Sequence, residues 1–66
     1  MKDYEKEYMR KIYKEIKLLQ ENGQQKELIK FINLAVIRAI YLNLSENVIN
    51  RLYLVKYYIE KGEKIW

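Results

Sequence analysis

The sequence predicts an all-α domain of three helices, and three observations support this prediction. Proline is absent and glycine occurs only twice, so little in the chain interrupts helix formation. Half of the residues are hydrophobic and a third are charged, which is typical of a helical bundle rather than of a disordered segment. Apolar residues also recur at spacings of three and four along most of the chain. Because the chain has 66 residues, we expect one domain, residues 1–66, with a single small core.

The first predicted helix covers about residues 2–21. Its apolar stripe consists of Tyr4, Tyr8, Ile12, Ile16 and Leu19, with Met9 beside them. A basic row at the same helical spacing lies opposite and consists of Lys6, Arg10, Lys14 and Lys17. We interpret Asp3, Glu5 and Glu15 as surface charges that dilute the field of this basic row. Asn22 and Gly23 end the helix, since glycine tolerates the left-handed conformation of a last turn.

The second predicted helix covers about residues 24–42. Apolar residues surround nearly its whole circumference: Leu28, Ile29, Phe31, Ile32, Leu34, Ala35, Val36, Ile37, Ala39, Ile40 and Leu42. A helix that is apolar on most sides packs between other helices or against a second subunit. We therefore expect this helix to be the centre of the fold.

The third predicted helix covers about residues 45–61. Ser45 is a suitable N-cap, because its hydroxyl can accept a backbone N–H of the first turn, and Glu46 suits the positive end of the helix dipole. The inward stripe is formed by Val48, Leu52, Val55 and Ile59, with Ile49 alongside. Gly62 closes the helix. Since the links between the helices are short, the sequence predicts an up-down-up arrangement of antiparallel neighbours.

The segment from Ala39 to Leu52, AIYLNLSENVINRL, resembles the helix-turn-helix of phage and bacterial repressors. The matching positions are a small residue at the helix crossing, Ala39, a turn residue that accepts a positive φ, Asn43, and four apolar positions, Leu42, Leu44, Ile49 and Leu52. The resemblance implies that the second and third helices cross steeply, at about 90–120°. It also implies a small transcriptional regulator that binds double-stranded DNA.

In this interpretation the outward start of the third helix contacts DNA. The predicted contact residues are Ser45, Asn47, Asn50 and Arg51. Asparagine pairs with adenine edges, and arginine pairs with guanine or phosphate. Weaker contacts to the DNA backbone are expected from Lys6, Arg10, Lys14, Lys17 and Lys56. The formal net charge of +4 is compatible with such a partner.

The same turn also suits a plain helix stop followed by an N-cap, and both interpretations remain open. The alternative function is a non-catalytic protein–protein interaction or dimerisation module built as a three-helix bundle. Apolar residues on the outer side of the third helix and beyond it favour this function: Leu54, Tyr57, Tyr58, Ile65 and Trp66. They predict a homodimer, or a protein partner, docked through the C-terminal region.

The composition also excludes several classes of function. The chain contains no cysteine and no histidine, so disulfides, thiol nucleophiles, zinc fingers and imidazole chemistry are excluded. We expect no enzyme activity, no cofactor, no metal and no small-molecule substrate. The N-terminus MKDYEKEYMRK lacks the apolar segment of a signal peptide, and FINLAVIRAIYLNL is too short for a membrane span and contains Arg38. The expected location is therefore cytoplasmic.

Overall fold

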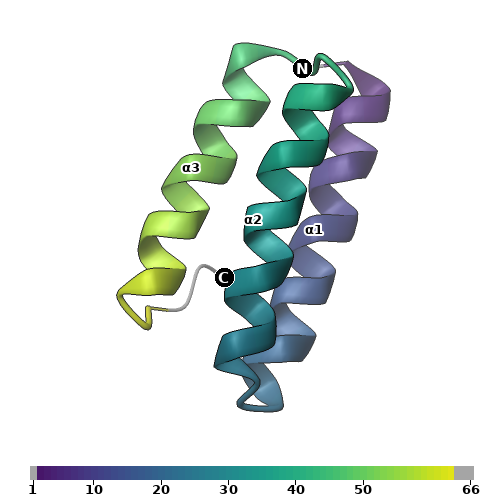
Figure 1. Ribbon diagram of the computed structural model, residues 1–66. Coiled ribbons are helices and arrows are strands. Elements are labelled where there is room, and N and C mark those ends of the chain that lie inside the picture. Colours follow the sequence, from purple (N-terminus) through teal and green to yellow (C-terminus); the bar gives the residue numbers. More distant parts are fainter. Residues whose placement is uncertain (1, 64–66) are drawn as a thin grey trace.

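A computed structural model describes residues 2–63, which form three α-helices joined by short turns (Figure 1). Helix α1 spans Asp3–Glu21, α2 spans Gln25–Tyr41 and α3 spans Glu46–Glu60. The all-α three-helix prediction is confirmed, and every predicted boundary lies within one residue of the observed one. Helix α2 is continuous over its 17 residues. In the described part of the chain, no helix combines the length and the hydropathy needed to cross a membrane.

All three helices end on a residue in the left-handed conformation. These residues are Gly23, Asn43 and Gly62, with φ of 67°, 57° and 79°. At Asn43, the N–H of Leu44 donates to the carbonyl of Ala39 and the N–H of Asn43 donates to the carbonyl of Ile40, both at 3.0 Å. This pair of bonds is a Schellman motif, in which a buried residue such as Leu44 anchors the turn. The positive φ predicted for Asn43 is confirmed.

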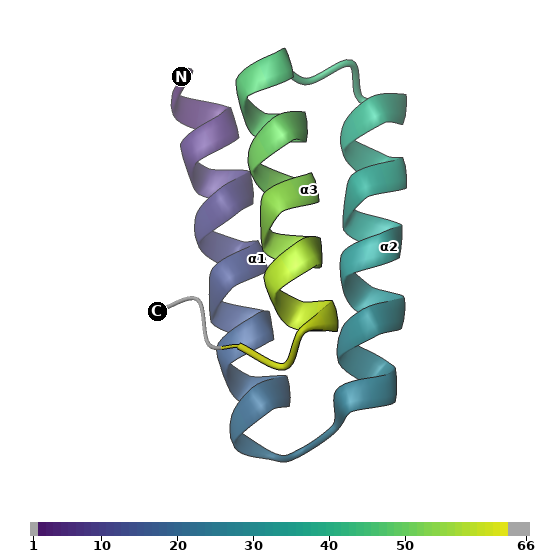
Figure 2. The ribbon, with the colours of Figure 1, turned by 90° about the vertical axis from the view of Figure 1, so that its left-hand side faces the viewer.

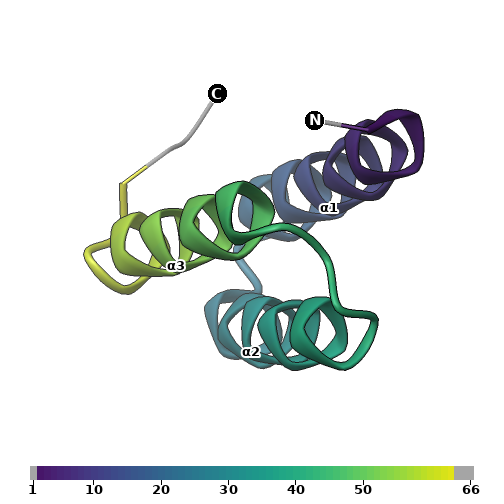
Figure 3. The same cartoon turned by 90° about the horizontal axis from the view of Figure 1, so that it is seen from above.

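The helices lie side by side, with α1 and α3 running in the same direction and α2 running against them (Figures 1 and 2). Seen along the bundle, α2 lies opposite the other two helices (Figure 3). The Cα atoms extend over 31 × 17 × 15 Å. At 1.5 Å per residue α3 is about 22 Å long, so its axis follows the long dimension rather than crossing the others. After Asn43 the chain therefore turns back along α2 as a bundle hairpin, and the steep crossing of α2 and α3 that the helix-turn-helix resemblance implied is wrong.

One stripe from each helix forms the core. The buried apolar residues are Met9, Ile12, Ile16, Leu28, Ile32, Ala35, Val36, Ala39, Leu44, Val48, Leu52, Val55 and Ile59. The inward stripe predicted for α3 is confirmed. In α1 the prediction is wrong at Tyr4, which is 56% exposed. Glu5 occupies the inward position of that first turn, four residues before Met9.

Glu5 is a buried carboxylate that joins two helix N-termini. Its Oε1 accepts the backbone N–H of Lys2 at 3.0 Å, and its Oε2 accepts the backbone N–H of Ser45 at 2.7 Å. The backbone bond from Ser45, followed by the bond from Lys2 and the Ser45 hydroxyl, lowers the pKa of Glu5 to about 2. The interpretation of Glu5 as a surface charge is therefore wrong, because only 2% of this residue is exposed.

Ser45 is the N-cap residue of α3, as predicted, but the predicted capping bond is not formed. Its side chain makes no hydrogen bond to the first turn of α3. Its backbone N–H instead donates to Glu5, 40 residues earlier in the chain. The carboxylate thus binds at the start of α3, where the helix dipole favours a negative charge.

Candidate interaction surfaces

Three of the four predicted DNA contacts on α3 share one outward face with the predicted interface residues of that helix. Asn47, Asn50 and Arg51 are all exposed, and they are followed at helical spacing by Leu54, Tyr57 and Tyr58. The first half of this face is polar and the second half is largely apolar and aromatic. Ser45 is exposed as well, although its N–H is bonded to Glu5.

The structure does not bring all the predicted basic contacts to that face. The four members of the basic row on α1 are exposed, and Arg10 pairs with Glu7 at 2.9 Å. Tyr8, Lys11 and Glu15 lie on the flank of α1 that faces α2, so the basic row lies on another flank. Lys56 is half-buried and lies on the flank of α3 that also holds Ile49, seven residues earlier. It is therefore separated from Asn47 and Arg51.

The apolar part of the α3 face is made mainly of tyrosines. Leu54 and Tyr57 are each 51% exposed and Tyr58 is 36% exposed. The rings of Tyr57 and Tyr58 have centroids 5.8 Å apart, and Lys61 Nζ lies 4.6 Å from the Tyr57 centroid. Tyrosine hydroxyls and a nearby cation keep such a surface compatible with water. The remaining predicted interface residues, Ile65 and Trp66, lie outside the described residues.

Helix α2 has an exposed side, rich in apolar residues, that neither α1 nor α3 covers. Leu34 is 61% exposed, Ile37 62% and Tyr41 88%, and their spacings of three and four place them on one side. Ile40 and Leu42, beside them, are 52% and 53% exposed. We call these five residues the α2 face. The sequence predicted that α2 packs between other helices or against a second subunit; within one chain, α1 and α3 cover only its inner side.

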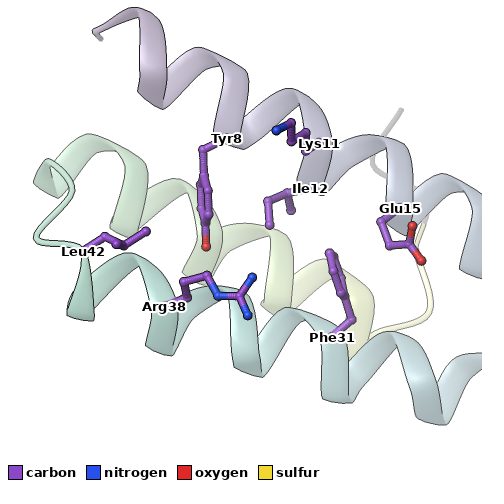
Figure 4. A pocket seen from close by; sticks show the side chains of 7 residues that line it. All are labelled: Tyr8, Lys11, Ile12, Glu15, Phe31, Arg38 and Leu42. Carbon is purple, nitrogen blue, oxygen red and sulfur yellow. The ribbon is translucent and has the colours of Figure 1, made fainter.

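A groove between α1 and α2 adjoins the α2 face (Figure 4). Its volume is about 430 Å³, and its lining consists of Tyr8, Lys11, Ile12, Glu15, Phe31, Arg38 and Leu42. The Tyr8 hydroxyl donates to the carbonyl of Ala35 at 2.7 Å, which joins the two walls. Burial raises the pKa of this hydroxyl, and the positive charge of Arg38 opposes that rise. We call this feature the α1–α2 groove.

Neither the groove nor the α2 face is among the sites predicted from the sequence, although packing of α2 against a second subunit is one of the predicted alternatives. Leu34 lies three residues after Phe31 and four before Arg38, so one stripe of α2 connects the groove with the face. The sequence contains this spacing, but it does not say which side of α2 the other helices leave uncovered. Within residues 2–63, no group of three or more acidic side chains lies close enough to hold a metal ion.

Comparisons of this chain with protein-family models, with curated proteins and with solved structures return no match.

Proposed function

We propose that the protein is a cytoplasmic, non-catalytic interaction module, a three-helix bundle that binds a protein partner through the α2 face and the α1–α2 groove. The exposure of Leu34, Ile37 and Tyr41 on one side of a regular helix is the observation that supports it. Contiguous apolar surface in water is unfavourable by about 25 cal/mol per Å², and proteins retain such patches mainly at binding sites.

The shape of the surface suits a partner helix. The lining of the groove includes the apolar residues Ile12 and Phe31, and the exposed Leu34 lies one helical turn after Phe31 on α2. Amphipathic helices bind to grooves of this kind through side chains spaced by three and four residues. Charged side chains at the rim, such as Lys11 and Arg38, then select the partner and its orientation.

The α2 face is a stronger candidate than the predicted interface on α3. Leu34 and Ile37 have no polar atom in their side chains, and both are more exposed than Leu54 or Tyr57. The tyrosines of α3 carry hydroxyl groups, which hydrogen-bond to water when the side chain is exposed. An interface at the α2 face would therefore remove more apolar surface from water than an interface at the outward face of α3.

A photocrosslinking amino acid at position 34 tests this proposal in the cells that make the protein. We expect p-benzoylphenylalanine at Leu34 to give a crosslinked protein product. The same group at Lys14, which is exposed on another flank of the bundle, is the matched control and should give none. Equal crosslinking from both positions, or none from Leu34, would contradict binding at the α2 face.

Binding of double-stranded DNA is the second candidate function, because Asn47, Asn50 and Arg51 are exposed together on a chain of net charge +4. We expect Arg51→Ala to weaken duplex binding and to lower the slope of log K against log salt by about 1, the effect of one lost phosphate contact. Lys26→Ala, at the exposed start of α2, is the control with the same change of charge. Fluorescence anisotropy at several salt concentrations measures both, and no binding at low salt would contradict this candidate.

A further inference from the structure

The charged side chains beside the groove are divided between its two ends. Figure 4 places Arg38 near Tyr8, and Glu15 lies at the other end, beyond Phe31. Glu27 lies one helical turn before Phe31, and therefore toward the same end as Glu15. Lys11 is on the wall opposite Arg38, between Tyr8 and Glu15. The Arg38 end of the groove is thus basic, the end with Glu15 and Glu27 is acidic, and Lys11 lies between them on the α1 wall.

These charges are available to a partner. Lys11, Glu15, Glu27 and Arg38 are all exposed. Within the described part of the chain, the ion pair that forms is Glu7 with Arg10, and it involves none of the four. Partner charges are therefore not in competition with existing pairs at this surface.

The stripe of α2 along the groove is symmetric about its own middle. Its residues are Glu27, Phe31, Leu34 and Arg38, with spacings of four, three and four. If a second α2 lies antiparallel across this midpoint, Glu27 faces Arg38 of the other copy and Phe31 faces its Leu34. Opposite charges then meet at both ends, and apolar side chains meet in the centre.

The two charged residues of α1 that line the groove, Lys11 and Glu15, have a centre of symmetry close to that of the α2 stripe. The midpoint between Lys11 and Glu15 is Tyr13. The hydrogen bond from Tyr8 to Ala35 places these two residues at about the same level along the bundle. Because α1 and α2 are antiparallel, Tyr13, five residues after Tyr8, is level with Lys30, five residues before Ala35. That level lies two to three residues, about 4 Å, from the midpoint of the α2 stripe. One two-fold axis across the helices therefore passes close to both midpoints.

We infer that the partner is a second copy of this chain, docked antiparallel through the α1–α2 groove so that α2 packs on α2. This inference rests on the proposed function and names its partner. The basic residues Lys11 and Arg38 of each copy lie opposite the acidic residues Glu15 and Glu27 of the other. Phe31 and Leu34 meet at the axis.

Self-complementarity is the reason to choose a second copy over an unrelated helix. A two-fold interface uses the same patch twice, so each charge must find its opposite at the mirrored position along the patch. An unrelated partner imposes no such symmetry on one surface. Parallel docking of two copies would place like charges together and is disfavoured.

A charge-exchange experiment tests this arrangement. One variant carries Lys11→Glu with Arg38→Glu, which makes both ends of the groove acidic. The other carries Glu15→Lys with Glu27→Lys, which makes both ends basic. All four positions are exposed, so circular dichroism should show unchanged helix content. Sedimentation equilibrium should give a dimer for the unaltered chain and at least a tenfold weaker dimer for each variant alone.

An equimolar mixture of the two variants should restore the dimer as a heterodimer, which a mass tag on one variant identifies. A monomeric unaltered chain, variants that dimerise as strongly as the unaltered chain, or a mixture that stays monomeric would each overturn the inference. If either variant fails to fold, the crosslink from position 34 decides whether the partner is a second copy of the chain. A product of twice the chain mass, joined near Phe31, supports the second copy.

The crosslink also separates failure of this inference from failure of the proposed function. A product from position 34 that contains a different protein overturns the second copy, while binding at the α2 face stands. The absence of any crosslinked product from position 34 would contradict both the second copy and binding at the α2 face. The two proposals therefore have different outcomes in the same measurement.

Discussion

Replacing Glu5 by glutamine is expected to destabilise the folded chain at neutral pH and to remove most of its sensitivity to acid. The carboxylate accepts the N–H groups of Lys2 and Ser45, one with each oxygen. A glutamine amide keeps one acceptor and turns an NH₂ group toward the second N–H, so one buried donor loses its partner. The substitution also removes a negative charge that lies at the N-terminus of both α1 and α3.

The direction of the pH dependence follows from the pKa of Glu5. Its pKa falls from an ordinary value of 4.5 to about 2 on folding. A lowered pKa in the folded state means that the stabilisation is fully present above pH 4.5. It is lost progressively as the pH falls from 4.5 toward 2, because the unfolded chain then binds a proton that the folded chain does not.

Urea unfolding followed by circular dichroism between pH 7 and pH 2.5 measures this difference. The unfolding free energy of the unaltered chain should fall steeply below pH 4.5. Glu5→Gln should have a lower unfolding free energy at pH 7, and this value should change little with acid because the titrating carboxylate is absent. Glu21→Gln is the matched control, because Glu21 is exposed on the same helix and is not part of the α1–α2 groove. The same loss of stability with acid in the unaltered chain and in Glu5→Gln would contradict the role assigned to this carboxylate.

Local patterns predicted the helices well because the signals that start and stop a helix lie within a few residues of its ends. Gly23 and Asn43 end α1 and α2 through bonds that span five residues or fewer. The inward stripe of α3 was equally local, since helical spacing alone defines it. Glu5 was missed because its burial depends on Ser45, which is 40 residues away in sequence.

The turn at Asn43 shows where local agreement ends. Ala39 is buried, Asn43 has a positive φ and Leu44 is buried, as the helix-turn-helix resemblance implies for these positions. A Schellman motif has the same requirements. The motif sets how α2 ends, but packing of α3 against the whole bundle sets the angle at which it leaves. The antiparallel arrangement favours the interaction module, and DNA binding remains a prediction.

The uncovered side of α2 was also beyond local patterns. Apolar residues on every side of this helix predicted contact all round it. Which side α1 and α3 leave open depends on the direction of both neighbours, and the structure shows that the open side is the one with Leu34 and Ile37.

The same substitution at two leucines of α2 should separate folding from association. Leu28 is fully buried in the core and Leu34 is 61% exposed. Leu28→Ala leaves a cavity and should lower the free energy of unfolding by about 2–5 kcal/mol. For a domain of 66 residues the total free energy of unfolding is about 3–10 kcal/mol, so this variant should be largely or partly unfolded at 37 °C.

Leu34→Ala should change the unfolding free energy of the single chain by less than about 0.5 kcal/mol, because it removes surface that is already in water. Its effect should appear in assembly. If two chains associate through the α2 face, the unfolding midpoint of the unaltered chain rises with protein concentration, since dimerisation stabilises the folded state by mass action. Leu34→Ala should show a weaker rise.

Thermal unfolding at several protein concentrations, followed by circular dichroism, measures both variants. A large loss of stability for Leu34→Ala in dilute solution would place this residue in the core and contradict its exposure. A midpoint that depends equally on concentration in Leu34→Ala and in the unaltered chain would show that association uses another surface. Because both variants make the same change on the same helix, helix propensity is matched, and the difference between them isolates what each side of α2 does.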